Sequence, residues 1–377
     1  MATIDKSLPN TKTEFEIPAE EEIVESQQEI IERQQGGEPE ITMDEEGGAT
    51  VEFDPAKVNP EGGQDHFENL ADYLEDNVLD PLASELMEKY TNYKESRQEW
   101  ADSYREGLNL LGFKYVTRTE PFRGASSVTH PVLAEAVTQF QAQAYKELLP
   151  ADGPVRTQIM GDANVAKEEQ SKRVKDFMNY QIMDQMKEYE PEFDQMLFYL
   201  PLSGSTFKKV YYDDLLGRAV SKFIPADDLV VPYSATSLED AEAVIHVIRI
   251  SQNDLRKQQI NGFYRDIDLG EPPLQEDQIK QKELELEGIQ QNGTEDMFTI
   301  LEMHVNVDLD GYEDVNPEDN EPTGIQLPYI ITIDEANGKV LSIRRNFEPN
   351  DPLKKKKDYF VHYKFLPGMG FYGLGLI

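Results

Sequence analysis

The 377-residue sequence contains no cysteine. Disulfides and thiolate metal sites are therefore excluded, which suits a protein of a reducing compartment. No stretch approaches the ~20 consecutive apolar residues that a membrane-spanning helix needs, and no basic-then-apolar segment opens the chain as a secretory signal would. The sequence therefore predicts neither a secretory signal nor a membrane partner.

Positive charge is also scarce. The chain has 36 Lys and Arg residues against 73 Asp and Glu residues, which gives a formal net charge of −37. Because affinity for DNA comes largely from Lys and Arg that neutralise phosphates, we expect a poor general nucleic-acid binder that would still make a suitable wall beside DNA. The one concentrated basic run predicts a contact to phosphate or to an acidic partner, with a solvated loop as the alternative. Its residues are Lys354, Lys355, Lys356 and Lys357.

Patterns typical of catalytic sites are missing or incomplete. The sequence has no Walker-type Gly-x-x-x-x-Gly-Lys-Ser/Thr loop, and its histidines never pair at i,i+4. Ser126 and Ser127 lie near His130, but without the strand–elbow–helix context of a hydrolase nucleophile. Asp308 to Gly311 has the residue types of a calcium loop without its spacing, and this predicts a solvated turn.

A glycine motif near the end of the sequence, Gly368-x-Gly370-x-x-Gly373, matches a dinucleotide-binding fingerprint. A pyrophosphate site also needs a helix after the glycines, and only four residues follow Gly373. We interpret this segment as a flexible joint. Together the patterns predict no catalytic, cofactor-binding or metal-binding residue, and a protein that is not an enzyme.

Composition and periodicity predict an α+β fold in three parts. Residues 1–65 are acidic and poor in aromatics, which predicts a disordered tail in which Glu20 to Gln35 could form a helix on a partner. Residues 66–203 predict long helices, and residues 204–377 predict a β-rich, wing-like region.

In the helical part, Phe67 to Val78 has helical spacing, and Asp80-Pro81 predicts the start of a second helix that runs to Leu111. The aromatics on that helix predict an interface with a neighbouring subunit, because aromatics are enriched at interface cores. They are Tyr90, Tyr93, Trp100 and Tyr104. The alternative is that residues 163–202 cover this face within one subunit. Further predicted elements are helices over 131–148 and 163–202, the latter restarting at Glu190-Pro191, and a short strand over 155–160.

In the β-rich part, the stretch from Gly204 to His246 predicts one β-sheet unit with strands at 206–212, 218–223, 229–231 and 243–250. A short helix capped by Ser251 follows, then a polar surface excursion over 270–295. Later strands are predicted at 297–309, in a hairpin of 327–334 with 339–345, and at 359–365.

Four stretches give the chain a resemblance to a known family. They are Phe122 to Pro131, Glu147 to Val155, Gly204 to Pro232, and His362 through Ile377, and together they fall within residues 66–377. In their order and spacing the chain resembles the portal (head–tail connector) proteins of tailed bacteriophages.

This resemblance implies a ring, typically a dodecamer, at one capsid vertex of the virion, assembled in the host cytoplasm. Such a ring nucleates head assembly with capsid and scaffolding proteins and docks the terminase. It passes double-stranded DNA without sequence recognition and then holds the tail adaptor proteins. The family's stem helices and clip have no clear counterpart before Ile377, so we expect the wing-side portion of such a subunit. The alternatives are a nucleic-acid-processing enzyme of the same packaging system, or a non-viral cytoplasmic adaptor or scaffold that uses its acidic tail.

Overall fold

The computed structural model describes most of the chain after residue 65. The described residues are 40–43, 49–52, 66–111, 122, 124, 130–161, 164–213, 216–272, 278–288, 297–315, 321–349, 351–368 and 370–377. The chain divides into two units, residues 1–68 and residues 69–377. In the first unit, strands β1 (Glu40–Met43) and β2 (Ala49–Glu52) form an antiparallel pair. The rest of the predicted acidic tail, including the helix expected over 20–35, lies outside the described residues.

The second unit contains two antiparallel sheets. The larger has the order β5 (Leu229–Val230), β6 (Ala243–Ser251), β7 (Met297–Val307), β8 (Leu327–Asp334) and β9 (Val340–Arg345). The smaller has the order β10 (Phe360–Lys364), β3 (Ser205–Asp213) and β4 (Arg218–Ile224). The prediction of one sheet unit between residues 204 and 246 is therefore wrong, because the chain leaves the smaller sheet after β4 and enters the larger one at β5. The individual strands were predicted correctly.

The described helices precede and interrupt these strands. They are η2 (Leu70–Asp72), α2 (Asp76–Ser96), α3 (Gln98–Leu108), η3 (Asn109–Leu111), α4 (Val132–Leu148), α5 (Val165–Tyr180), the π-turn η4 (Gln181–Gln185), α6 (Tyr189–Ser203), α7 (Gln252–Ile260) and α8 (Gln278–Glu287). The last of these lies within the predicted polar excursion. The strand predicted over 155–160 is absent from this described segment. Among the described residues, no helix has the length and apolar character of a membrane span.

The predicted helix boundary at Asp80-Pro81 is corrected. Helix α2 begins at Asp76, and Pro81 lies inside it. A proline there cannot donate its helical hydrogen bond, but Leu79 and Leu86 on either side are buried against the larger sheet. Packing of this apolar face therefore outweighs the local stop signal. The helix also does not continue to Leu111, because it breaks at Arg97, which belongs to neither α2 nor α3.

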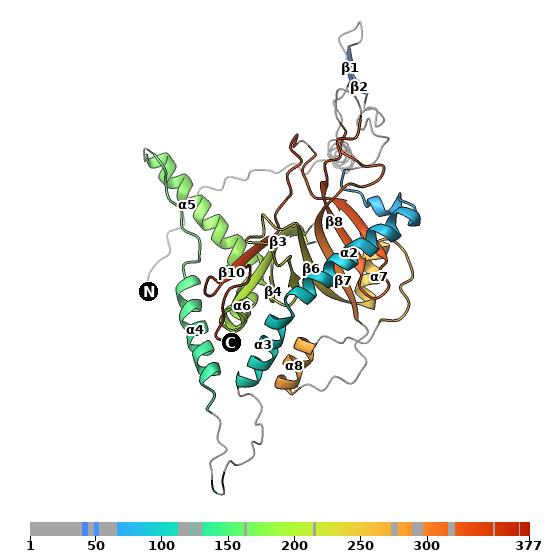
Figure 1. Cartoon of the computed structure of the whole chain (residues 1–377). Helices are drawn as coiled ribbons and strands as arrows, with labels where there is room; N and C mark the ends of the chain where they lie inside the picture. The colour runs from blue at the N-terminus through green and yellow to red at the C-terminus, as the bar shows by residue number, and fades with distance from the viewer. Residues whose placement is uncertain are drawn as a thin grey trace, which may run out of the picture. The chain divides into compact units, whose positions relative to one another are not determined.

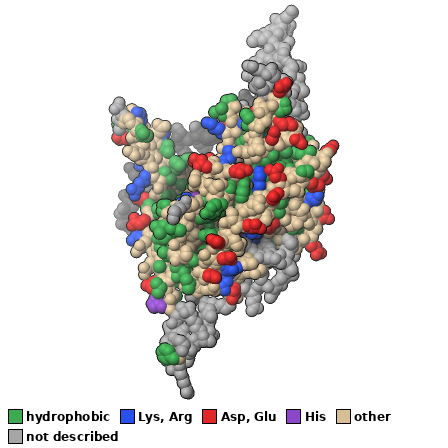
Figure 2. Space-filling model, in the orientation of Figure 1, with side chains coloured by type: hydrophobic (Ala, Val, Ile, Leu, Met, Phe, Trp, Pro, Cys, Tyr) green, Lys and Arg blue, Asp and Glu red, His purple; other side chains and the backbone are tan. Residues whose placement is uncertain are grey.

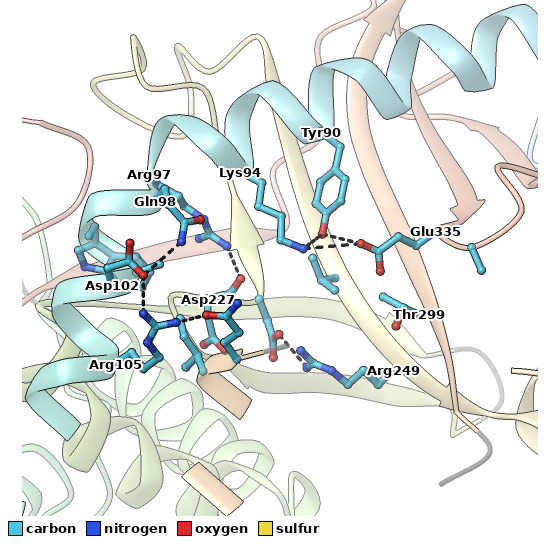
Figure 3. Close-up of a pocket in the computed structure, with 17 residues that line it drawn as sticks. Tyr90, Lys94, Arg97, Gln98, Asp102, Arg105, Asp227, Arg249, Thr299 and Glu335 are labelled. Atoms are coloured by element: carbon cyan, nitrogen blue, oxygen red, sulfur yellow. Dashed lines mark hydrogen bonds and ion pairs between the residues drawn. The ribbon is translucent and has the colours of Figure 1, made fainter. Parts of the chain in front are cut away.

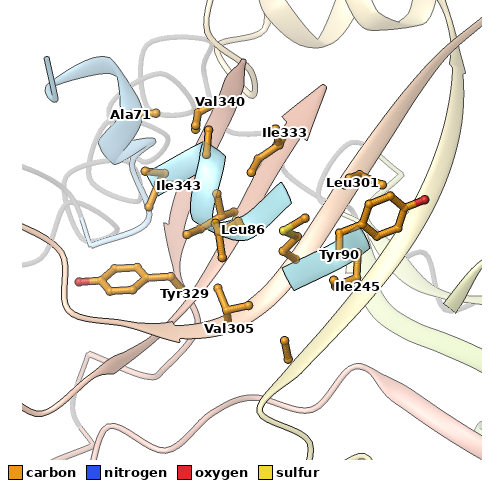
Figure 4. Close-up of a cluster of buried hydrophobic side chains, with 14 of the residues drawn as sticks. Ala71, Leu86, Tyr90, Ile245, Leu301, Val305, Tyr329, Ile333, Val340 and Ile343 are labelled. Carbon is orange, nitrogen blue, oxygen red and sulfur yellow. The ribbon is translucent and has the colours of Figure 1, made fainter. Parts of the chain in front are cut away.

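The main core lies between α2 and one face of the larger sheet (Figure 4). Leu86 and Tyr90 of α2 meet alternate residues of the strands, such as Ile245 and Leu301, as the two-residue period of a strand requires. Figure 1 shows α2 crossing this sheet, with α6 beside the smaller one. The opposite face of the larger sheet carries Glu302 and His304, which meet Lys209 and Phe360 of the smaller sheet. The two sheets therefore pack against each other on that side.

Candidate interface, pocket and charge clusters

The four aromatics predicted to face a neighbour pack within the subunit. Tyr90 and Tyr104 are only 4% and 3% exposed, and Tyr93 packs at the edge of the core beneath α2. Trp100 stacks between Tyr104 and Tyr372, with ring centroids 5.6 and 5.4 Å apart. This face is therefore not left open for a second subunit. The alternative prediction, that residues 163–202 cover these aromatics within one subunit, is confirmed only in part. Helix α6 packs near Tyr104, but the larger sheet covers Tyr90.

The break between α2 and α3 is held by Arg97. Its guanidinium donates to the carbonyl oxygens of Ala226 and Leu229, at 2.7 and 3.1 Å, and to the Tyr372 hydroxyl at 3.2 Å. The Tyr372 hydroxyl in turn donates to the Leu229 carbonyl at 3.1 Å. One side chain therefore joins the helical break, the entry to the larger sheet and the chain's last segment. No proline or glycine at position 97 announces this break.

A pocket of about 520 Å³ lies beside this break, between α2, α3, α8 and the larger sheet (Figure 3). Its cationic side chains are each paired with a neighbour. Lys94 lies 3.7 Å from Glu335, Arg105 lies 2.8 Å from Asp102, and Arg249 lies 2.8 Å from Asp228. The Tyr90 hydroxyl also donates to Glu335 at 3.1 Å. Because these three cations each have a carboxylate and Arg97, which also lines the pocket, is bound to carbonyl oxygens, the pocket presents no concentrated charge of one sign to a ligand.

The predicted basic run is largely engaged within the chain. The amines of Lys354 and Lys357 lie 2.6 and 2.7 Å from the carboxylates of Asp314 and Glu348. Lys356 donates to the Leu238 carbonyl at 3.3 Å. Three of the four lysines therefore bind groups of the same chain. The run is a weaker candidate for a phosphate or partner contact than its sequence indicates.

The glycine motif lies against the turn between α6 and β3. The Gly373 N–H donates to the Ser205 hydroxyl at 2.7 Å, and a Cβ on Gly373 would come 2.4 Å from the Gly204 carbonyl oxygen. Gly204 itself has φ +76° and caps α6, a conformation that favours glycine. No helix follows the glycines among the described residues of this segment. Gly373 therefore serves close backbone packing, and the interpretation of the segment as a flexible joint is corrected at this glycine.

A charged cluster lies between the two sheets. The Lys209 amine of β3 contacts both carboxylate oxygens of Glu302 on β7, at 2.5 and 2.6 Å. His304 Nε2 lies 2.8 Å from the same carboxylate. Burial opposes ionisation of Glu302, but Lys209 and His304 outweigh it and hold its pKa well below its usual range. Burial lowers the pKa of His304, so we assign it as neutral and donating to Glu302.

A second buried amine faces α6. Lys208 is 2% exposed, and its amine lies 4.0 Å from the ring centroid of Tyr189 and 4.9 Å from that of Phe193. Burial lowers its pKa to about 8, against the attraction of Glu192 and Glu188. Within the described residues its amine has no hydrogen-bond partner. The aromatic rings therefore stabilise this charge in place of a carboxylate contact.

Exposed apolar side chains lie on α4 and α5. None of the residues of α5 is buried, although Val174, Phe177 and Met178 lie at helical spacing and form an apolar stripe. Phe177 is 59% exposed. Val132 and Leu148 of α4 are exposed as well. The stripe was visible in the sequence, but its exposure depends on tertiary packing.

Comparisons with known proteins add no identification, because no protein-family model and no curated protein matches the chain. The serine pair near His130 lies outside the described residues. Across the part of the chain that is described, no group of three or more His, Asp or Glu residues is placed to hold a metal ion.

Proposed function

We propose that this chain is a structural subunit of a portal-like ring, the conduit for packaging and ejecting DNA at a capsid vertex. The observation that carries the proposal is the uncovered apolar stripe of α5. A helix in water gains most of its stability from burying such a face, and the described residues of the second unit leave this one exposed.

The rest of the molecule is consistent with such a role. The body is an α+β unit whose four predicted interface aromatics are used internally, and α5 leaves an apolar surface available for a neighbour. The formal net charge of −37 suits a wall past which DNA moves without adhering. By the resemblance, the partners are copies of the chain in a dodecamer, the terminase, capsid and scaffolding proteins, and tail adaptor proteins, in the virion.

The experiment is a measurement of assembly state over a wide concentration range, by mass photometry and negative-stain electron microscopy. A ring subunit gives closed particles, or at low concentration partial arcs, whose masses are multiples of 43.1 kDa. A chain that stays monomeric at every concentration, including with any downstream coding sequence appended, contradicts the proposal and favours the acidic adaptor or scaffold.

A further inference from the structure

The α5 helix carries two polar contacts and an exposed apolar stripe. The Ser171 hydroxyl donates to Thr157 at 2.8 Å, and the Asn179 side chain accepts from the Val155 N–H at 2.9 Å. These bonds tie the helix to the segment that precedes it. Val174, Phe177 and Met178 are exposed, and Val174 and Met178 follow Ser171 by three and seven residues, so the stripe begins next to that contact. The helix is thus positioned by polar contacts, and an exposed apolar stripe runs beside them.

One basic side chain, Arg173, lies beside the apolar stripe, and further exposed charges of both signs lie on the same helix. Arg173 lies four residues before Phe177 and therefore shares its side of the helix. Lys172 and Arg156 are also exposed, and none of these three has an ion-pair partner among the described residues. Figure 2 shows Lys and Arg side chains along the upper left of the molecule, where Figure 1 places α5. This is unusual in a chain with a net charge of −37.

A matching acidic stripe lies on α2 and α3. Glu88 and Glu95 are seven residues apart on α2, and Glu99 and Glu106 are seven residues apart on α3, so each pair shares a helix face. All four are exposed, and within the described residues none forms an ion pair. Leu110, four residues beyond Glu106, is exposed too and adds an apolar contact at the end of the stripe.

We infer that the α5 face of one copy docks on the acidic α2–α3 stripe of the next copy. This inference rests on the proposed ring. The lengths are comparable, since the 16 residues of α5 span about 24 Å, and Glu88 to Glu106 follow about 27 Å of helical path, with a break at Arg97. The two surfaces belong to different elements, so the contact is head-to-tail and generates a ring or an open helix rather than a two-fold dimer.

The absence of cysteine makes a direct cross-linking test possible. Arg173→Cys and Glu95→Cys are each made in the full chain, and the two proteins are oxidised alone and mixed. The inference predicts a disulfide dimer in the mixture and little in either protein alone. Strong cross-linking of Arg173→Cys with itself would indicate a two-fold contact and overturn the inference. A Lys257→Cys variant on α7 is the control for random collision.

A second test separates assembly from folding. Phe177→Ser and Arg173→Glu should each weaken self-association at least about tenfold in sedimentation velocity. The thermal melting of the monomer should stay unchanged because both side chains are exposed. Glu95→Lys should restore association of the Arg173→Glu chain, and Lys257→Glu should have no effect.

The outcomes distinguish the inference from the function on which it rests. Rings that persist in Phe177→Ser, with no cross-link between positions 173 and 95, overturn this interface and leave the ring intact. A lower melting temperature of the Phe177→Ser monomer would show that the chain itself covers α5, and this also overturns the inference. A chain that never associates contradicts both.

Discussion

The folded chain should lose stability in mild acid because of His246. This residue lies opposite Glu302 across the β6–β7 pair, and its Nδ1 is buried without a hydrogen-bond partner among the described residues. The nearby charged or titratable groups are Glu302, Lys209, His304 and Lys222. Burial lowers the pKa of His246 from 6.5 to about 3, although Glu302 acts in the opposite direction.

The sign and size of this loss of stability follow from proton linkage. Between these two pKa values the unfolded chain binds a proton at His246 and the folded chain does not, so the free energy of unfolding falls as pH drops below 6.5. At pH 5.5 His246 alone contributes an expected loss of about 1.4 kcal/mol relative to pH 8, and this contribution grows down to its folded pKa. We choose pH 5.5 because the pI is near 4.4, where solubility falls.

The assay compares the chain with its His246→Gln variant by urea unfolding at both pH values. Trp100 is the only tryptophan and is stacked between two tyrosines, so its fluorescence reports unfolding. The variant should lose about 1.4 kcal/mol less than the parent between pH 8 and pH 5.5. An equal loss in both proteins would refute the assignment of a neutral, buried His246.

Three further predictions concern the other sites. Glu302→Gln should destabilise the fold by about 3–5 kcal/mol in urea unfolding, because it leaves the Lys209 ammonium largely buried without its carboxylate; a loss below 1 kcal/mol would contradict this. Gly373→Ala should lower the free energy of unfolding by about 1–3 kcal/mol, because its Cβ would meet backbone at the α6–β3 turn. Gly370→Ala should leave the free energy of unfolding unchanged, because a Cβ there meets nothing within 4 Å. The chain should show no gel shift with duplex DNA at physiological salt, and neutralising Lys354–Lys357 should change nothing; a submicromolar affinity that this change abolishes would contradict the paired state of the run.

The strands could be predicted because their signals are local. The β3–β4 and β8–β9 pairs follow from alternating residues on either side of a turn, and both were found at nearly the predicted positions. The division into two sheets could not be predicted in the same way. Strand β10 pairs with β3 across about 150 intervening residues, and no local pattern encodes which edge a distant strand joins.

The helices could also be predicted only in part from the sequence. Residues 132–148 and the restart near Pro191 follow from caps and periodicity. The break at Arg97 does not, because it depends on backbone carbonyls of the loop before β5, more than 120 residues away. The aromatics of α2 and α3 were predicted to face a neighbouring subunit, whereas they pack within the chain, because their cover comes from the same distant contacts.

Apolar side chains are divided between the interior and the exposed face of α5, and this division has a consequence for assembly. The large aromatics Trp100 and Tyr104 serve the interior, where they hold Tyr372 beside the helical break. The exposed α5 face combines Val174, Phe177 and Met178 with the basic side chain of Arg173. Interfaces of obligate complexes are more apolar than this, whereas separable ones resemble ordinary protein surface. On the proposed interface, the subunit folds first and then associates through a contact that salt weakens, so ring closure depends on many moderate contacts around the circle.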